Sequence, residues 1–166
     1  MYDFTFDSGQ PRGEFYRELA DAAAALTEGE SDAVANMANI AALLWQALPE
    51  LNWAGFYRML DGMLVLGPFC GKPACIRIPL GQGVCGAAAA DGRSRLVEDV
   101  HAFPGHIACD AASRSELVVP VMADGRVIAV IDLDSPRLAR FDAQDREGLE
   151  LLAARIAPAI AGKSTG

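Results

Sequence analysis

The sequence has few basic residues and no long hydrophobic run. Lysine and arginine together number 14 against 22 aspartate and glutamate residues, so the formal net charge is -8. A chain of that charge is repelled by nucleic acid and by anionic lipid, and we expect neither as a partner. No run of about 18 apolar residues occurs, so we expect no membrane-spanning helix. Residues 1–16 also lack the basic and apolar regions of a secretory signal, and a cytoplasmic location is expected.

The cysteines and histidines lack the spacing of a metal site. No two of Cys70, Cys75, Cys85 and Cys109 are separated by two residues, and the only histidines, at positions 101 and 106, form no flanking pair. We therefore expect no metal site. A glycine-flanked serine of the hydrolase type is absent, and "GQGVCG" lacks the lysine of a phosphate loop. In a reducing compartment static disulfides are rare, so each thiol is left as a small buried group or a redox participant.

The length and composition of the chain are typical of a globular protein with one domain, over residues 1–166. Apolar residues make up 52% and charged residues 22% of the chain. Helical spacing of apolar residues predicts two helices within residues 13–48 and a last helix over 142–160. Between them, residues 52–134 change to the period of two that is typical of strands and carry the loops richest in Cys, Gly, His and Pro. Long ordered loops in a small domain are usually functional.

Turn and cap residues refine this prediction. Ser31 and Asp142 are the expected N-caps of the second and last helices. Asp61-Gly62 and Asp124-Gly125 each lie between alternating segments and predict two tight hairpins. The sum is an α+β fold: a central antiparallel sheet with the N- and C-terminal helices packed on one face.

Thiol chemistry fits the long connection "HAFPGHIACDAASRSELVVPV". Thiol redox catalysis requires an attacking thiolate, a second thiol within reach, and a pocket for the oxidised substrate. Cys109 lies in this connection, Cys75 lies between a loop and a strand, and Cys85 lies near a helix N-terminus. Cys85 could equally be a small residue packed against the sheet, and Cys70 resembles an incidental residue at a strand end.

Acidic and aromatic residues alternate along the expected strands. Asp132 and Asp134 in "VIDLDSP" share one face of a strand, and Glu116 opens the partner strand. Such a cluster could hold an ammonium group or donate a proton, although a solvated strand end followed by a turn is the alternative. Trp53 and Tyr57, four residues apart on one strand, could form the wall of an apolar pocket or belong to the core.

Several segments together resemble one known family. "NWAGFY", "LGPFCGKPACIRIPLGQGVCG", "VEDVHAFPGHIACDAASRSELVVPV" and "VIDLDSP" are similar to the free methionine-(R)-sulfoxide reductases, which are built on a GAF domain. The resemblance covers about Trp53 to Asp142. It implies a GAF-like fold with ligand-covering loops on the face of the sheet opposite the helices.

The resemblance also implies roles for the thiols. Cys109 matches the thiol that attacks the sulfoxide sulfur, Cys75 the thiol that forms a disulfide with it, and Cys85 an additional resolving thiol. Cys70 stands where the family usually has glutamine, which raises the question of whether an extra thiol exchanges with Cys75.

The remaining family positions concern substrate binding. Glu116, Asp132 and Asp134 match the carboxylates around the substrate's sulfoxide oxygen and amino group. Trp53 and Tyr57 match the aromatic walls of the pocket for the terminal methyl group.

The implied reaction is reduction of free L-methionine (R)-S-oxide to methionine, with recycling by thioredoxin and no cofactor. A homodimer formed through the terminal helices is a further expectation. The alternatives are a GAF domain that binds a small ligand without catalysis, or a redox or metal sensor that uses the same thiols.

Overall fold

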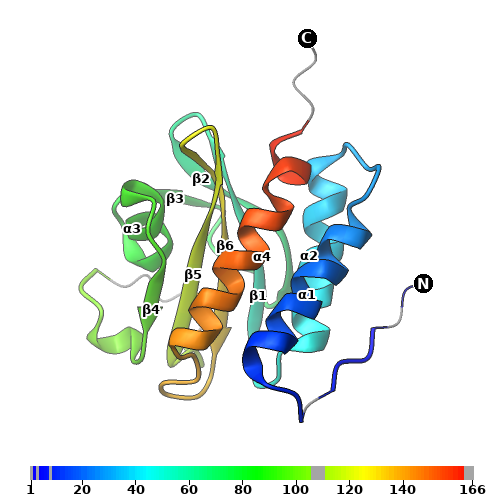
Figure 1. The fold of residues 1–166 in the computed structure, drawn as a ribbon. Helices are drawn as coiled ribbons and strands as arrows, with labels where there is room; N and C mark the ends of the chain where they lie inside the picture. The colour runs from blue at the N-terminus through cyan, green and yellow to red at the C-terminus, as the bar shows by residue number, and fades with distance from the viewer. Residues whose placement is uncertain (1, 3, 8, 106–110, 163–166) are drawn as a thin grey trace.

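The computed structural model describes residues 2, 4–7, 9–105 and 111–162 as four α-helices, a short 3-10 turn and a six-stranded sheet (Figure 1). The strands lie in the order β3-β2-β1-β6-β5-β4, and every neighbouring pair is antiparallel. The elements are α1 (Arg12–Leu26), α2 (Ala33–Ala47), β1 (Trp53–Leu60), β2 (Met63–Gly71), β3 (Arg77–Pro79), α3 (Gly83–Asp91), β4 (Arg95–Val97), η1 (Val100–Ala102), β5 (Ser115–Ala123), β6 (Arg126–Ser135) and α4 (Ala143–Ala161).

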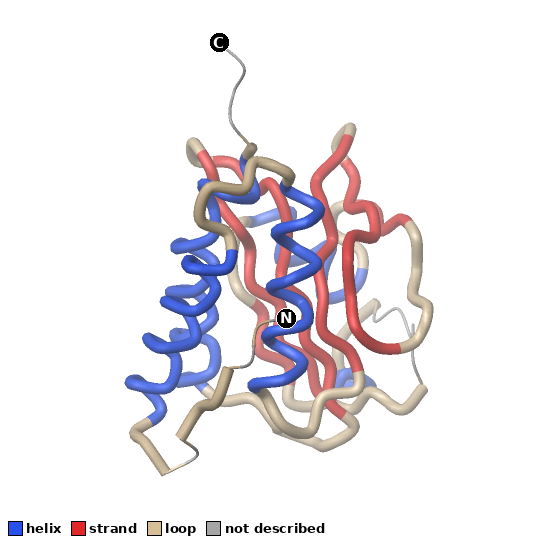
Figure 2. The backbone as a smooth tube through the Cα atoms, turned by 90° about the vertical axis from the view of Figure 1, so that its right-hand side faces the viewer, coloured by secondary structure: helices blue, strands red, loops and turns tan. Residues whose placement is uncertain are grey.

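The sheet separates two apolar layers. Helices α1, α2 and α4 lie side by side over one face, and α3 lies apart from them near β4 (Figure 1; Figure 2 shows the long helices beside the twisted sheet). The larger buried cluster joins the long helices to residues such as Phe56 and Ile131, whereas a smaller cluster on the opposite face contains Trp53, Tyr57 and Val84. The predicted α+β class and the helices on one face are therefore confirmed. None of the helices in the described residues is long and apolar enough to cross a membrane.

Both predicted hairpins are confirmed. Asp61 and Gly62 between β1 and β2 have φ values of 51° and 75°, and Asp124 and Gly125 between β5 and β6 have 49° and 71°. Two consecutive residues with positive φ form the turn whose twist matches that of the adjoining strands. The turns thereby fix the register of the two hairpins, which decides the face to which each side chain points.

One of the two predicted helix caps is wrong by one residue. The N-cap of α2 is Asp32, whose carboxylate accepts a hydrogen bond from the Ala35 N–H at 2.8 Å. Ser31 lies one residue too early for a helix that begins at Ala33, because a capping side chain reaches the amide three residues beyond it. Asp142 caps α4 as predicted and forms a capping box with Asp145.

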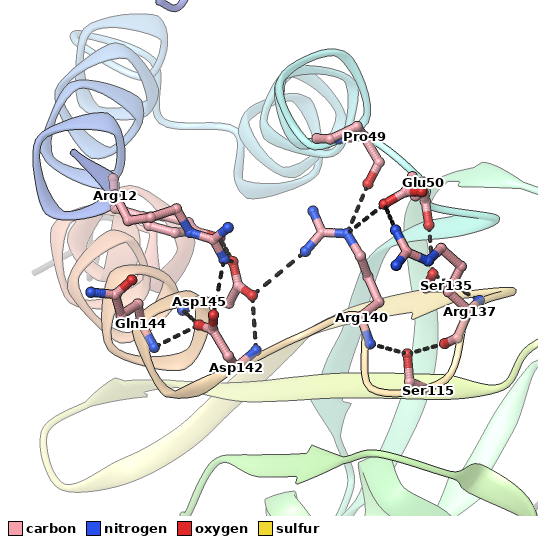
Figure 3. A network of polar contacts seen from close by, with 11 residues as sticks. Arg12, Pro49, Glu50, Ser115, Ser135, Arg137, Arg140, Asp142, Gln144 and Asp145 are labelled. Atoms are coloured by element: carbon pink, nitrogen blue, oxygen red, sulfur yellow. Dashed lines mark hydrogen bonds and ion pairs between the residues drawn. The ribbon is translucent and has the colours of Figure 1, made fainter. Parts of the chain in front are cut away.

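A buried ionic network joins the start of α1 to the start of α4. Asp145, only 1% exposed, accepts hydrogen bonds from the Tyr16 hydroxyl at 2.6 Å and from the Arg12 guanidinium, and Arg140 Nη1 lies 3.5 Å from its other oxygen. Figure 3 shows Arg12 and Arg140 reaching this carboxylate from different elements. Burial and the neighbouring Asp145 raise the pKa of Tyr16, so the phenol stays a donor.

Close packing of α1 on α4 generates a stability prediction. Gly148 faces the Tyr16 ring, and a β-carbon at this position would overlap the ring atoms. We expect Gly148→Ala to lower the free energy of unfolding by about 1–3 kcal/mol, the usual effect of overpacking, despite the better helix propensity of alanine. Urea denaturation measures the change, with the exposed Glu147→Ala on the same helix as the control. Equal stability of Gly148→Ala and the wild type would contradict this packing.

Candidate active site

A cavity lies on the face of the sheet opposite the long helices. Its walls come from β1, the β2–β3 connection, the start of α3 and the facing ends of β5 and β6. Six residues singled out in the sequence line it, namely Trp53, Tyr57, Cys85, Glu116, Asp132 and Asp134. Residues from four separate elements therefore meet at one place.

Strand register explains how the acidic side chains meet. Glu116 on β5 pairs directly with Asp134 on β6, which in turn pairs with Trp53 on β1. These three residues form one row across the sheet, and their side chains share a face. Asp132 belongs to the next row, where its partner on β1 is Gly55. Asp132 lies two residues before Asp134 on β6, so its side chain points to the same face of the sheet.

The cluster is buried and unusually hard to ionise. Glu116 is 5% exposed and Asp132 is 6% exposed. Burial, followed by the charges of Asp132 and Asp134, raises the pKa of Glu116 well above its ordinary value. Burial also raises the pKa of Asp132 to about 6. The cluster therefore retains a proton near neutral pH, which gives it the capacity to act as an acid.

Cys85 is enclosed by the same cluster. It lies in the first turn of α3, is 4% exposed, and its Sγ lies 3.9 Å from Glu116 Oε1. Burial and the charges of Asp132 and Glu116 raise the pKa of the Cys85 thiol well above its ordinary value. A protonated thiol is a poor nucleophile. Cys85 is thus a small packed residue and a cavity-lining thiol at once.

The other predicted thiols are placed differently. Cys75 is half-buried and packs against the apolar cluster on the cavity side of the sheet. Cys109, like His106 before it, lies outside the described residues. Beyond it, the buried Ser113 lines the cavity and accepts a hydrogen bond from Asn52 Nδ2 at 3.0 Å. The described end of the connection is therefore attached beside the acidic cluster.

Cys70 lies on the opposite face of the sheet. It pairs with Ala54, whose side chain belongs to the core under the long helices. Paired strand residues point to the same side, so the Cys70 thiol points away from the cavity. The sheet thus separates Cys70 from Cys75, and direct exchange between the two thiols would require the strand to turn over.

The aromatic wall includes a residue that the sequence did not reveal. Trp53 stacks on Tyr57 with ring centroids 5.8 Å apart and on Phe69 with centroids 5.2 Å apart. The Trp53 indole N–H donates to the Lys72 carbonyl at 3.1 Å, which fixes the ring. The only sequence signal for Phe69 is Gly55, because a β-carbon there would overlap the Phe69 side chain.

Comparison with known proteins agrees with this geometry. A family model described as GAF domain matches residues 34–161. The free methionine-R-sulfoxide reductase of Escherichia coli is 49% identical over 148 residues, which cover 89% of this chain and 90% of the relative. The protein of the same name from Saccharomyces cerevisiae is 41% identical over 159 residues, which cover 91% and 88%.

A solved structure gives the same result. The free methionine-R-sulfoxide reductase of Neisseria meningitidis, determined in complex with its substrate, superposes with a TM-score of 0.90 at 44% identity and covers 97% of this chain and 96% of that one. The chain is therefore an enzyme of the free methionine-R-sulfoxide reductase family, built on a GAF domain.

Proposed function

We propose that this enzyme reduces the free amino acid methionine R-sulfoxide to methionine, with Cys109 as the attacking thiol. The observation that carries the proposal is the meeting of an acidic trio, the buried Glu116 and Asp132 and the half-buried Asp134, with an aromatic wall in one cavity. Relatives bearing the reductase name share this chain over most of its length.

The charges around the cavity suit a free amino acid. The acidic trio attracts an ammonium group. On another wall, Lys72 and the start of α3 contribute positive potential, because Gly83 and Val84 line the cavity and the N-cap Gln82 makes no side-chain capping hydrogen bond. A zwitterion presents one charge to each wall. A peptide-bound methionine lacks both charges.

The stacked rings of Trp53 and Tyr57 form the apolar part of the pocket. Both side chains are buried, at 4% and 1% exposed, and both line the cavity. We assign this wall to the terminal methyl group of the substrate. The sulfoxide oxygen then lies toward the acidic trio.

The acidic trio can supply the proton that the sulfoxide oxygen needs in order to leave. Sulfoxide oxygen leaves sulfur only after protonation, and a carboxylic acid with a raised pKa supplies the proton near neutral pH. The Cys109 thiolate attacks the sulfur, the oxygen is transferred, and methionine departs as Cys109 becomes a sulfenic acid. The Cys75 thiol condenses with the sulfenic acid and releases water, which leaves a Cys75–Cys109 disulfide.

An external dithiol completes the cycle. We propose a thioredoxin-type protein as the reductant, because such dithiols have low reduction potentials and return a protein disulfide to two thiols. The polypeptide then requires no cofactor of its own. Pairing of two copies through the exposed side of α4 and the cytoplasmic location stay predictions.

The first prediction separates catalysis from ligand binding alone. We expect Cys109→Ser to abolish thioredoxin-coupled NADPH consumption, because a hydroxyl does not replace the attacking thiolate. Cys70→Ser is the matched control and should keep full activity, since its thiol lies on the other face of the sheet. Wild-type turnover by Cys109→Ser would contradict the assignment of Cys109, whereas absence of turnover by the wild type itself would favour a non-catalytic or sensing domain.

A second prediction concerns the resolving thiol. Cys75→Ser should reduce close to one equivalent of substrate in a single turnover and then slow sharply, because no disulfide with Cys75 can form. The measurement is methionine formed per enzyme in the absence and presence of thioredoxin. Undiminished steady-state turnover would transfer the resolving role to Cys85, and Cys85→Ser provides the comparison.

A third prediction tests recognition of the ammonium group. Acetylation of the substrate nitrogen removes its positive charge and leaves buried carboxylates without a cation, so we expect kcat/KM to fall by at least about 100-fold. The assay compares free methionine sulfoxide with its N-acetyl derivative. Equal values for the two compounds would exclude a free amino acid as the preferred substrate.

The raised pKa of Asp132 also affects stability. Its value of about 6 exceeds the ordinary 3.8, so between these values the folded state holds a proton that the unfolded state lacks. Stability therefore decreases as the pH rises through this window, by up to about 1.4 kcal/mol per pKa unit. We expect Asp132→Asn to be more stable than the wild type well above pH 6, with the gain disappearing near pH 4.

Urea denaturation at both pH values measures this difference. The exposed Glu147→Gln serves as the control, because it removes one carboxylate without changing a buried charge. A gain that is the same at both pH values would show that Asp132 does not carry the proton.

A further inference from the structure

Three metal-binding side chains converge in the cavity from three different elements. Cys85 comes from α3, Glu116 from β5 and Asp132 from β6. One donor atom of each residue lies within 4.8 Å of the other two, and all three residues are buried. No spacing motif in the sequence indicates this set, because the register of the β5–β6 hairpin and the position of α3 create it.

One oxygen of this set lacks a partner. Within the described part of the chain, Asp132 Oδ1 is buried and accepts no hydrogen bond, although the residue is 6% exposed and lines the cavity. A buried carboxylate oxygen without a donor is costly unless a cation or a ligand reaches it. This oxygen therefore points to a positively charged occupant of the cavity.

The distances fit a thiophilic divalent cation. Zinc bonds of about 2.3 Å to sulfur and about 2.1 Å to oxygen place the donor atoms of a tetrahedral site about 3.6 Å apart. Cys85 Sγ and Glu116 Oε1 already lie 3.9 Å apart, and all donor atoms lie within 4.8 Å of one another, so a movement of at most about 1 Å, which side-chain rotation supplies, completes the site. One sulfur with two carboxylates favours Zn²⁺ or Cd²⁺ over Mg²⁺ and Ca²⁺, which prefer oxygen donors only.

We propose that the reduced protein binds one thiophilic divalent cation through Cys85, Glu116 and Asp132, and that this cation excludes the amino acid substrate. The exclusion rests on the proposed function, because the ammonium group of the substrate uses the same carboxylates. Three protein ligands leave a fourth position for water, as is typical of open zinc sites. The cation is an inhibitor here, since it occupies the place of the substrate.

The binding test uses metal alone. Reduced protein, treated with a chelator and then freed of it, is titrated with Cd²⁺ while the ultraviolet absorption of cadmium–thiolate bonds is followed. We expect one equivalent to bind with a thiolate band. Cys85→Ser should lose the band and bind Cd²⁺ more than about 100-fold more weakly, since even outer-shell changes lower metal affinity 10–100-fold.

Two further variants make the result decisive. Asp132→Asn preserves the shape of the side chain and should weaken Cd²⁺ binding while keeping the thiolate band, because the sulfur ligand remains. Cys70→Ser should match the wild type in both respects, since that thiol lies across the sheet. Circular dichroism verifies that each variant is folded. If Cys85→Ser or Asp132→Asn binds Cd²⁺ as tightly as the wild type, the proposal is wrong.

Substrate competition then tests the exclusion. Free methionine sulfoxide should raise the apparent dissociation constant for Cd²⁺ in proportion to its concentration, and Zn²⁺ should inhibit reduction competitively. If the sulfoxide does not change the apparent dissociation constant for Cd²⁺, the proposal that the cation excludes the substrate is wrong. If the protein binds Cd²⁺ through Cys85 but does not reduce the sulfoxide, the metal site is supported and only the proposed function is contradicted. The two failures are therefore distinguishable.

Discussion

The crowding of buried carboxylates at the end of the β5–β6 hairpin determines the character of this protein. Glu116 and Asp134 are direct cross-strand partners, an arrangement that is destabilising for two like charges. The rest of the hairpin maintains it. Leu117 and Leu133 pair one step further along and are buried under the long helices, and a one-residue slip would move them to the wrong face. The core therefore holds the acids together against their own repulsion.

A second buried carboxylate shows the contrast with an ordinary structural acid. Asp145 is as buried as Glu116, but two arginines and a tyrosine hydroxyl surround it (Figure 3). Within the described residues, Glu116 and Asp132 form no ion pair with a cationic side chain, and the polar groups that act on them are each other, Asp134 and the Cys85 thiol. Fixed cationic side chains therefore neutralise Asp145, whereas Glu116 and Asp132 remain able to bind a proton or a cation.

Local patterns revealed the sheet and the acidic face but not the distances between elements. Alternation along "VIDLDSP" and the Asp-Gly turns predicted the hairpin, because both signals are local. The N-cap of α2 was wrong by one residue, since Ser31 and Asp32 are both good caps and only the helix start decides between them. Phe69, which stacks on Trp53, and Ser113, which lines the cavity, were missed because contacts with distant segments place them there. The approach of Cys85 to Glu116 depends likewise on where α3 lies.

The surroundings of the thiols argue for a division of labour among them. While the acids around it are charged, Cys85 is held as a thiol by their field and by burial, so it is a weak competitor for the first attack or for an oxidised sulfur. Cys75 is half-buried on the connection between β2 and β3 and packs against the apolar cluster on the cavity side of the sheet. Under the proposed mechanism, donation of a proton to the departing oxygen leaves the trio more negative, which strengthens this field and disfavours the Cys85 thiolate further. The carboxylates that are proposed to protonate the departing oxygen thereby keep Cys85 in its thiol form, which supports the proposal of Cys75 as the resolving thiol.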